Sequence, residues 1–200
     1  MNGRRGAGGE QAGSVRIIGG THRRRLIRFP DRESLRPTPD RVRETLFNWL
    51  GQDLTGRECL DLFAGSGALG FEAASRGARR VVMVERDATA LRSLRDNVAT
   101  LGLTRVEVLA HDALEFLRQQ PRARFDVIFA DPPFVNGDPA GLLDRVWPHL
   151  APAARVYVEA PVAIEPVDDW TLLRSTRAGR VHAHLFTPAE PSTTTGPPQA

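Results

Sequence analysis

The stretch of sequence that decides the fold is Glu58-Cys59-Leu60-Asp61-Leu62-Phe63-Ala64-Gly65-Ser66-Gly67-Ala68-Leu69-Gly70. It opens with a short apolar run, which is typical of a buried strand, and it ends where a helical pattern begins. Between the two, the glycines follow the G-x-G-x-x-G pattern, in which they allow a tight turn and a close approach of the backbone to a ligand. A strand, a glycine-rich turn and a helix in this order predict the first unit of a nucleotide-binding α/β fold.

The alternation of strand and helix continues along the chain. Apolar runs that favour strands occupy residues 80–85, 106–110, 125–130 and 155–159, and helical patterns occupy residues 87–101, 113–120 and 141–150. Repeated strand–helix units predict a parallel, doubly wound sheet with right-handed crossovers. Two more runs, at residues 170–176 and 180–186, predict a closing antiparallel hairpin.

A rigid corner follows the strand predicted at residues 125–130, in the sequence Asp131-Pro132-Pro133-Phe134. Each proline fixes its own φ and lacks an N–H group, so the corner is stiff and its carbonyl groups have few local donors. The result is a cluster of hydrogen-bond acceptors beside an aromatic face. Such a cluster suits a nucleobase that carries an exocyclic amino group, whereas the tetrapeptide alone also fits a proline-rich surface turn.

The positive charge of the chain is concentrated near its N-terminus. Residues 1–45 hold 11 arginines against 5 acidic residues, although the net charge of the whole chain is only +3. The chain has no lysine, so guanidinium groups make every basic contact, and these groups suit phosphates and bases. Strand patterns at residues 14–18 and 25–29 predict a basic hairpin, and Thr38 with Pro39 predicts a helix start. This asymmetry favours a polyanion as partner.

Composition excludes several classes of protein. No apolar run reaches the roughly 20 residues that span a bilayer, and the N-terminus lacks the apolar core of a signal peptide. The one cysteine, Cys59, is expected in the core and fits a reducing cytoplasm. His182 and His184 alternate along a predicted strand, where we expect a surface or edge role, and no metal site is predicted. A cytoplasmic protein is therefore expected.

Two cofactors fit the glycine loop. Glu85 lies 20 residues after Gly65 at the end of the next predicted strand, where an acid binds ribose hydroxyls in dinucleotide sites. A nicotinamide dinucleotide is therefore one alternative. Asp61 counts against it, because a carboxylate just before the loop repels a pyrophosphate and suits the ammonium or sulfonium group of S-adenosylmethionine. The chain also lacks groups for hydride transfer, and His111 with Asp112 is placed to meet an adenine.

These motifs together resemble those of class I S-adenosylmethionine-dependent methyltransferases that modify amino groups. Two upstream segments narrow the resemblance, Arg16-Ile17-Ile18-Gly19-Gly20 and Leu35-Arg36-Pro37-Thr38-Pro39-Asp40-Arg41-Val42-Arg43-Glu44-Thr45-Leu46-Phe47-Asn48-Trp49-Leu50. From about Arg16 to Phe186 the chain closely resembles the bacterial RsmD family, which methylates N2 of one guanine in 16S ribosomal RNA. The resemblance implies an α/β fold with a seven-stranded, doubly wound sheet and an N-terminal basic β-hairpin that contacts the substrate.

The residues and the resemblance together assign three groups of site residues. The catalytic residues are expected to be Asp131, Pro132 and Phe134, which would hold the amine of a flipped guanine and stack on its ring. The residues expected to bind S-adenosylmethionine are Thr38, Asp61, Phe63, Ala64, Gly65, Gly67, Glu85, Arg86, Asp112, Ala113 and Asp131. The residues expected to bind RNA are Arg16, Arg23, Arg24, Arg25, Arg36, Arg41 and Arg43.

Four segments are expected along the chain. They are a disordered basic tail at 1–13, an RNA-contacting hairpin and helix at 14–55, a methyltransferase domain at 56–187 and a second disordered tail at 188–200. The expected partner is 16S ribosomal RNA within a small-subunit assembly particle. The protein is expected to act as a monomer, without contact to a membrane.

Two other functions stay open. Relatives that act on DNA often carry Asn and Tyr at the ends of the tetrapeptide, where this chain has Asp131 and Phe134, so a DNA adenine or cytosine amino-methyltransferase is one alternative. No segment is long enough for a domain that reads DNA sequence, which counts against it. The other alternative is an RNA-binding module that keeps a nucleotide fold only as a scaffold, but a scaffold needs neither Asp61 nor Glu85.

Overall fold

The computed structural model describes residues 12–31, 37–119, 124–133, 138–165 and 169–189. Runs rich in valine, leucine and isoleucine form the parallel part of its main sheet, which consists of β3 (Glu58–Asp61), β4 (Arg80–Glu85), β5 (Val106–Ala110), β6 (Phe125–Ala130) and β7 (Leu150–Ala160). The antiparallel strands β8 (Trp170–Ala178) and β9 (Val181–Pro188) complete it, in the order β5-β4-β3-β6-β7-β9-β8. The carboxyl ends of the parallel strands meet at one edge, where ligands bind in open α/β sheets.

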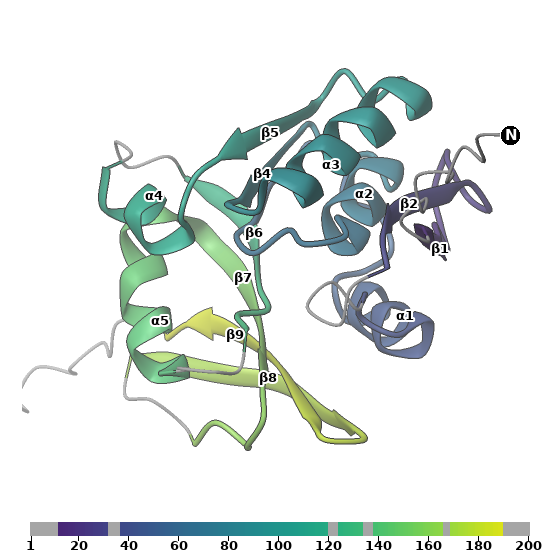
Figure 1. Ribbon diagram of the computed structural model, residues 1–200. Coiled ribbons are helices and arrows are strands. Elements are labelled where there is room, and N and C mark those ends of the chain that lie inside the picture. The colour runs from purple at the N-terminus through teal and green to yellow at the C-terminus, as the bar shows by residue number, and fades with distance from the viewer. Residues whose placement is uncertain (1–11, 32–36, 120–123, 134–137, 166–168, 190–200) are drawn as a thin grey trace, which may run out of the picture.

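Helices cover both faces of this sheet (Figure 1). One face carries α1 (Asp40–Trp49), α2 (Ala68–Ser75) and α3 (Ala88–Leu101). The other face carries α4 (Ala113–Gln119), α5 (Pro139–Val146) and the 3₁₀-helix η3 (Trp147–His149). Helix α3 has a well-formed start, since the side chain of Asp87 accepts hydrogen bonds from the N–H groups of Thr89 and Ala90.

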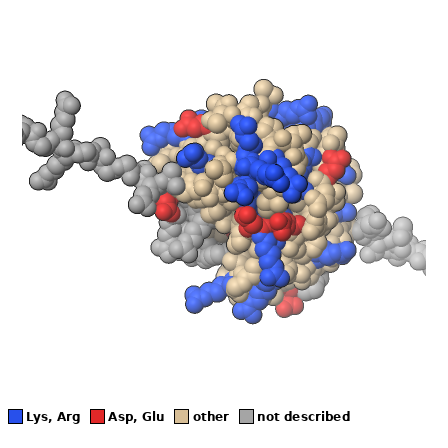
Figure 2. Space-filling model, turned by 90° about the vertical axis from the view of Figure 1, so that its right-hand side faces the viewer, with Lys and Arg blue, Asp and Glu red and all other residues tan. Residues whose placement is uncertain are grey.

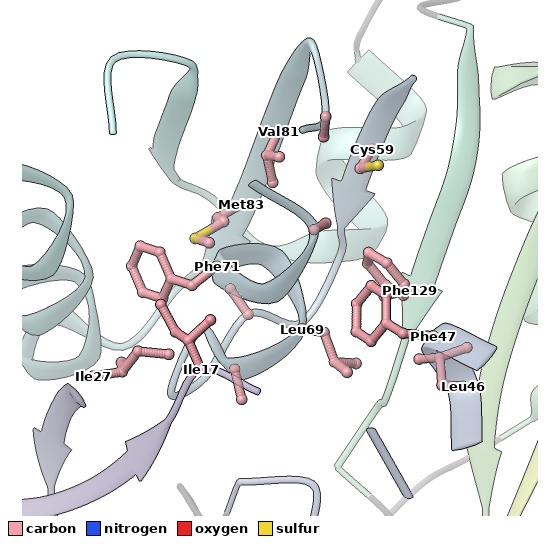
Figure 3. Packing of buried hydrophobic residues seen from close by; sticks show 14 of the residues in the cluster. Ile17, Ile27, Leu46, Phe47, Cys59, Leu69, Phe71, Val81, Met83 and Phe129 are labelled. Carbon is pink, nitrogen blue, oxygen red and sulfur yellow. The ribbon is translucent and has the colours of Figure 1, made fainter. Parts of the chain in front are cut away.

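Aromatic side chains fill the core between the sheet and α1 and α2 (Figure 3). Phe47 of α1 packs against Phe129 of β6 with ring centroids 5.9 Å apart. Phe71 of α2 is fully buried on the same side of the sheet as Met83 of β4. Helix α1 is thereby fixed on the half of the sheet that contains β6, and the segment before it is brought to the carboxyl edge.

The N-terminal hairpin, β1 (Ala12–Arg16) and β2 (Leu26–Pro30), forms its own antiparallel sheet against α2 and α3. Its turn fits closely on the end of α2. Gly20 has a φ of +74°, and a Cβ there would lie 1.9 Å from the carbonyl oxygen of Ser75. The N–H of Thr21 donates to that carbonyl at 2.7 Å, and the N–H of His22 donates to the Ser75 hydroxyl at 2.9 Å. The hairpin is therefore held in one orientation on the core.

A second contact fixes the other strand of the hairpin. The amide side chain of Asn97 in α3 donates to the Arg28 carbonyl at 2.7 Å and accepts from the Arg28 N–H at 3.1 Å. It thus satisfies the backbone of β2 much as a neighbouring strand would. The arginines between β1 and β2 are left on the surface.

Several boundaries differ from the sequence predictions. Thr38 and Pro39 predict a helix start, and α1 begins at Asp40, directly after Pro39, without a side-chain cap; the hydroxyl of Thr38 bonds to Glu159. The helix predicted at 141–150 is shorter, because Pro148 interrupts it and η3 follows. Residues 12, 13 and 188 belong to strands and residue 189 is described as well, whereas residues 1–11 and 190–200 of the two predicted tails lie outside the described residues.

The expected surface or edge role of the histidines is also wrong for His184. Strand β9 lies between β7 and β8, so it is not an edge strand. The His184 side chain is 1% exposed, and its Nε2 accepts a hydrogen bond from the N–H of Ile164 at 3.1 Å. Burial lowers the pKa of this imidazole, which keeps it neutral.

Candidate active site

Acidic side chains line the carboxyl edge of three neighbouring strands. In the parallel register, Asp61 of β3 lies opposite Phe129 of β6, and Ala130 lies opposite Val158 of β7. Asp131 and Glu159 therefore form the next pair beyond the last one in the ladder. Because side chains alternate along a strand, these three carboxylates leave the sheet on the face that α1 and α2 cover.

Asp61 is buried below the glycine loop. Its Oδ2 accepts a hydrogen bond from the N–H of Gly70 in α2 at 2.9 Å. The pKa of this carboxyl is raised to about 7, chiefly because burial disfavours the charge; the Gly70 hydrogen bond opposes this rise, and the negative charge of Glu85 adds to it. A buried carboxyl of this kind gains stability from a cation beside it.

Glu85 holds the glycine loop through its side chain. Its Oε2 accepts from the N–H of Gly65 at 2.8 Å, and its Oε1 accepts from the N–H groups of Arg86 and Asp87 at 2.7 and 2.8 Å. The loop also requires glycine at position 67, where φ is +78° and a Cβ would lie 2.5 Å from the ring of Phe71. The loop and the acid thus form one rigid unit at the ends of β3 and β4.

The next strand end completes this row with Asp112. Its Oδ1 accepts from the N–H groups of Leu114 and Glu115 at 3.0 and 3.2 Å, so it caps helix α4. Its Oδ2 lies 3.4 Å from Nη1 of Arg86. Ala113 behind it is buried. Phe63 and Ala64, which begin the glycine loop, lie at the same edge, half-buried and buried respectively.

Asp131 and Pro132 are half-buried at the end of β6. Burial raises the pKa of Asp131 well above its ordinary value, and the charges of Glu159 and Asp61 raise it further. Phe134, the expected stacking residue, lies outside the described residues. The structure therefore brings Asp131 to the same edge as the glycine loop, on the same face as Asp61.

Sequence reasoning missed Glu159 and Tyr157. Glu159 is 4% exposed, and its Oε1 accepts a hydrogen bond from the Tyr157 hydroxyl at 2.8 Å. The hydroxyl of Thr38, from the segment before α1, also donates to this carboxylate. One signal was available, because the run at 155–159 ends in an acid, as the runs that end at Asp61 and Glu85 do. The partners of Glu159 come from distant segments, which the sequence does not reveal.

Most of the expected RNA-binding arginines lie on the surface. Arg16, Arg23, Arg24, Arg25 and Arg41 are exposed. Basic side chains gather at the centre of the face that includes the hairpin, and a group of acidic side chains lies directly beside them (Figure 2). Arg36 lies outside the described residues.

The expected RNA contact of Arg43 is wrong. Its side chain is fully buried, and its Nη2 donates to the Arg16 carbonyl at 2.9 Å and to Asp40 Oδ1 at 2.7 Å. Its Nη1 lies 3.3 Å from Glu72 Oε2. The helical pattern of residues 40–49 does not mark this position as inward, because arginine is seldom buried unless it is paired.

Two further properties concern the described part of the chain. None of its helices is long and apolar enough to cross a membrane. It contains no group of three or more His, Cys, Asp or Glu side chains arranged to hold a metal ion.

The strand ends fit S-adenosylmethionine better than a dinucleotide. The buried carboxyl of Asp61 suits a cation, whereas the position of Glu85 against the glycine loop fits the ribose of either cofactor. Asp112 and Ala113 stand at the third strand end of this edge, after β5. A doubly wound sheet of this order with these strand ends defines a class I S-adenosylmethionine-dependent methyltransferase.

Comparison with known proteins identifies the family. The chain belongs to the family described as Conserved hypothetical protein 95, which it matches over residues 15–187. It is 44% identical over 184 residues to the Ribosomal RNA small subunit methyltransferase D of Haemophilus influenzae, and the match covers 87% of this chain and 94% of the relative.

Two solved structures share the fold. The protein yhhF from Escherichia coli has a TM-score of 0.78 at 40% identity, covering 88% of this chain and 98% of its own. The T. thermophilus 16S rRNA N2-guanosine methyltransferase RsmC, solved in complex with AdoMet and guanosine, has a TM-score of 0.68 at 27% identity, covering 90% of this chain and 50% of its own.

Proposed function

We propose that this protein transfers a methyl group from S-adenosylmethionine to the exocyclic N2 of a guanine in 16S ribosomal RNA. The observation that carries the proposal is the position of Asp131, at the end of β6 on the same face as Asp61 and beside the glycine loop. This position supports a role for Asp131 as the acceptor for an amine, close to the carboxyl of Asp61 that suits a cationic methyl donor. Family membership supports the same reaction, since relatives are named as small-subunit ribosomal RNA methyltransferases.

The residues of the edge have separate roles in this proposal. Glu85 accepts hydrogen bonds from ribose hydroxyls, and Asp61 faces the cationic part of the methyl donor. Asp112 and Ala113 contact the adenine. The glycine loop, which includes Phe63, Ala64, Gly65 and Gly67, lies beneath the cofactor. Two residues border the site: Thr38, in the segment before α1, and Arg86, at the end of β4. The bound S-adenosylmethionine supplies an electrophilic methyl group on a sulfonium.

The substrate guanine must leave its stack to reach this edge. Its N2 lone pair is delocalised into the ring, so N2 is a poor nucleophile in the planar state. Hydrogen bonds from N2–H to the Asp131 carboxylate and the Pro132 carbonyl draw the amine towards tetrahedral geometry and stabilise the positive charge that develops on nitrogen. Phe134 stacks on the flipped base, which contributes about 1–3 kcal/mol.

The exposed arginines of the hairpin hold the RNA in this proposal. The hairpin is fixed on α2 and α3, so Arg23, Arg24 and Arg25 present their charges in a defined place relative to the active site. The substrate is an assembly particle of the small subunit in the cytoplasm, and the protein acts on it as a monomer.

Methyl transfer to defined nucleic acids tests the proposal. We expect purified protein with labelled S-adenosylmethionine to label 16S ribosomal RNA, in free or particle form, at N2 of one guanine, and to leave duplex DNA unlabelled. Asp131→Ala should lower the single-turnover rate by about 10²–10³ or more, as the loss of one preorganised acceptor does in comparable sites. Asp144→Asn, on the exposed face of α5, is the matched control and should react normally. Labelling of DNA amino groups in place of RNA contradicts the proposal.

A further inference from the structure

Glu159 lies directly beside the carboxylate that we place on the substrate amine. Ala130 of β6 is opposite Val158 of β7, so Asp131 and Glu159 are the next pair in the parallel register. Both side chains leave the sheet on the face of Phe129 and Tyr157. Among the charged groups that influence Asp131, Glu159 has the larger effect and Asp61 the smaller.

Two hydroxyl groups fix Glu159 in this position. The Tyr157 hydroxyl donates to its Oε1 at 2.8 Å, and the Thr38 hydroxyl donates to the same carboxylate from the segment before α1. Hydroxyl donors stabilise the ionised form, so they counteract burial, which raises the pKa of Glu159. Glu159 is 4% exposed, and its charge acts on the neighbouring Asp131 across a medium of low dielectric constant.

We propose that Glu159 is a positioning residue for methyl transfer, whose negative charge makes Asp131 a stronger base for the proton that leaves the substrate amine. The inference rests on the proposed function. In the reaction, N2 forms a bond to the methyl carbon, the carbon–sulfur bond breaks with its electron pair kept by sulfur, and N2 loses one proton. Asp131 takes that proton, after which the two carboxylates carry one negative charge in place of two. Relief of their repulsion favours the transfer.

Other groups that face the pair, among the described residues, do not cancel this effect. Asp61 of β3 adds a third carboxyl, and the pKa of Tyr157 is raised well above its ordinary value by burial and by Glu159, so Tyr157 stays a neutral donor. Arg43 is a buried cation on this side, and its Nε donates to the Thr38 carbonyl at 3.2 Å. Arg43 is itself neutralised by Glu72 and Asp40.

Single-turnover methyl transfer measured from pH 5 to pH 9 tests the role of Glu159. Glu159→Gln removes the charge and keeps the shape and the acceptor oxygen. We expect the acid limb of the rate profile to move to lower pH by about one unit, because Asp131 loses a like-charged neighbour. The plateau rate should fall by about 3- to 10-fold, because Asp131 becomes a weaker base. Glu165→Gln, at an exposed position after β7, should leave both unchanged.

A second variant separates charge from packing. Tyr157→Phe keeps Glu159 but removes one donor to its ionised form, so Glu159 holds its proton to higher pH. This variant should behave like Glu159→Gln at low pH and like the wild type at high pH. An acid limb that stays in place in Glu159→Gln, with S-adenosylmethionine affinity and melting temperature unchanged, overturns the inference.

A direct titration keeps this inference distinct from the proposed function. The carboxyl carbon of Asp131 can be followed by NMR in the free protein, without RNA or methyl donor. We expect a lower pKa of Asp131 in Glu159→Gln than in the wild type. Equal values overturn the inference even if RNA is methylated. Failure of the wild type to methylate RNA overturns the proposed function instead.

Discussion

The guanidinium of Arg43 and the carboxylate of Glu72 are both fully buried, and their nearest atoms lie 3.3 Å apart. Glu72 also accepts hydrogen bonds from the N–H groups of Ile18 and Gly19 at 2.8 and 2.7 Å, and from Nε of Arg76 at 2.9 Å. The Glu72 carboxylate of α2 thus bonds to three parts of the chain: the segment that follows β1, helix α1 and the end of α2. The N-terminal segment is attached to the methyltransferase core through this buried charge.

Arg43→Ala should therefore destabilise the fold strongly. The change leaves Glu72 with one buried cation fewer and leaves the carbonyls of Arg16 and Thr38 without their donor. Breaking one partner of a buried pair costs about 3–5 kcal/mol in the free energy of unfolding. Urea unfolding measures this loss. Arg41→Ala, an exposed change on the same helix, should alter the free energy of unfolding by no more than about 0.5 kcal/mol.

The contrast between Glu72 and Glu85 explains how far the sequence predicts this protein. Glu85 was predicted at the glycine loop because a strand end, a loop and a fixed spacing are local patterns, and the observed bond to Gly65 agrees with that placement. The parallel, doubly wound sheet followed from the same kind of pattern and its seven strands from the family resemblance, and the observed strand order confirms both. Glu72 sits within an apolar helix, and its partner Ile18 is 54 residues away.

Long-range pairing accounts for the other misses too. In the sequence, Arg43 looks like one more exposed arginine, because nothing near it shows that Glu72 is its buried partner. The position of Glu159 beside Asp131 follows from the register of β6 and β7. Its hydrogen bond to Thr38 joins it to a segment that precedes the main sheet in the chain. Neither relationship is visible in the local sequence. Such charged residues can be buried because distant residues pair with them, and a pattern along the chain does not identify those distant partners.

Glu85→Ala should weaken binding of S-adenosylmethionine. The variant loses the proposed acceptor for ribose hydroxyls and releases the N–H of Gly65. A hydrogen bond to a charged group contributes about 1.5–3 kcal/mol, so the dissociation constant should rise by about 10- to 100-fold. Calorimetry measures the change, with Glu107→Ala at an exposed position of β5 as the control. Tight binding of NAD to the wild type, or unchanged affinity in Glu85→Ala, contradicts the assignment.

Asp61 should make stability and cofactor binding depend on pH. Its pKa is raised from 3.8 to about 7 by burial, so the folded protein binds a proton that the unfolded chain has lost. Its contribution to stability is therefore complete below about pH 4 and is lost as the pH rises through 7. Across that window the wild type should lose up to about 4 kcal/mol of unfolding free energy relative to Asp61→Asn.

Urea unfolding of both proteins at a series of pH values measures this difference. In the wild type, the affinity for S-adenosylmethionine should rise from pH 5.5 to 7.5, because Asp61 ionises over this range and then attracts the cation. In Asp61→Asn the affinity should stay nearly constant. Parallel stability profiles for the two proteins show that Asp61 is ionised throughout and contradict the prediction.

Cys59 should be inert in the folded protein. It is fully buried, and burial raises the pKa of its thiol to about 12, with Asp126 adding to the effect. Since the thiolate is the reactive form, a disulfide reagent at pH 8 should react only at the rate of unfolding and at once in denaturant. The chain has a single cysteine, so the readout is unambiguous. Cys59→Ala combined with Glu44→Cys, an exposed position, should react rapidly; equally fast native labelling of Cys59 disproves its burial.

The last prediction concerns Arg23, Arg24 and Arg25, which lie exposed between β1 and β2. The turn around them is fixed by the backbone bond from Arg24 N–H to the Ile17 carbonyl at 2.8 Å and by the contacts with Ser75. Replacing all three with alanine should therefore preserve the hairpin and remove only charge. RNA affinity should fall for every sequence, because phosphate contacts carry no sequence information.

Salt dependence decides whether these arginines touch the RNA backbone. Each phosphate contact that is lost should reduce the magnitude of the slope of log K against log salt by about 0.7–0.9. Replacing Arg174, Arg177 and Arg180, which are exposed, changes the net charge equally, and the β8–β9 turn lies at the bottom of Figure 1, below α1, apart from β1 and β2. That control should keep the wild-type slope, and both variants should bind S-adenosylmethionine normally. If the two triple variants lose slope to the same extent, the effect comes from net charge alone and the hairpin holds no phosphate.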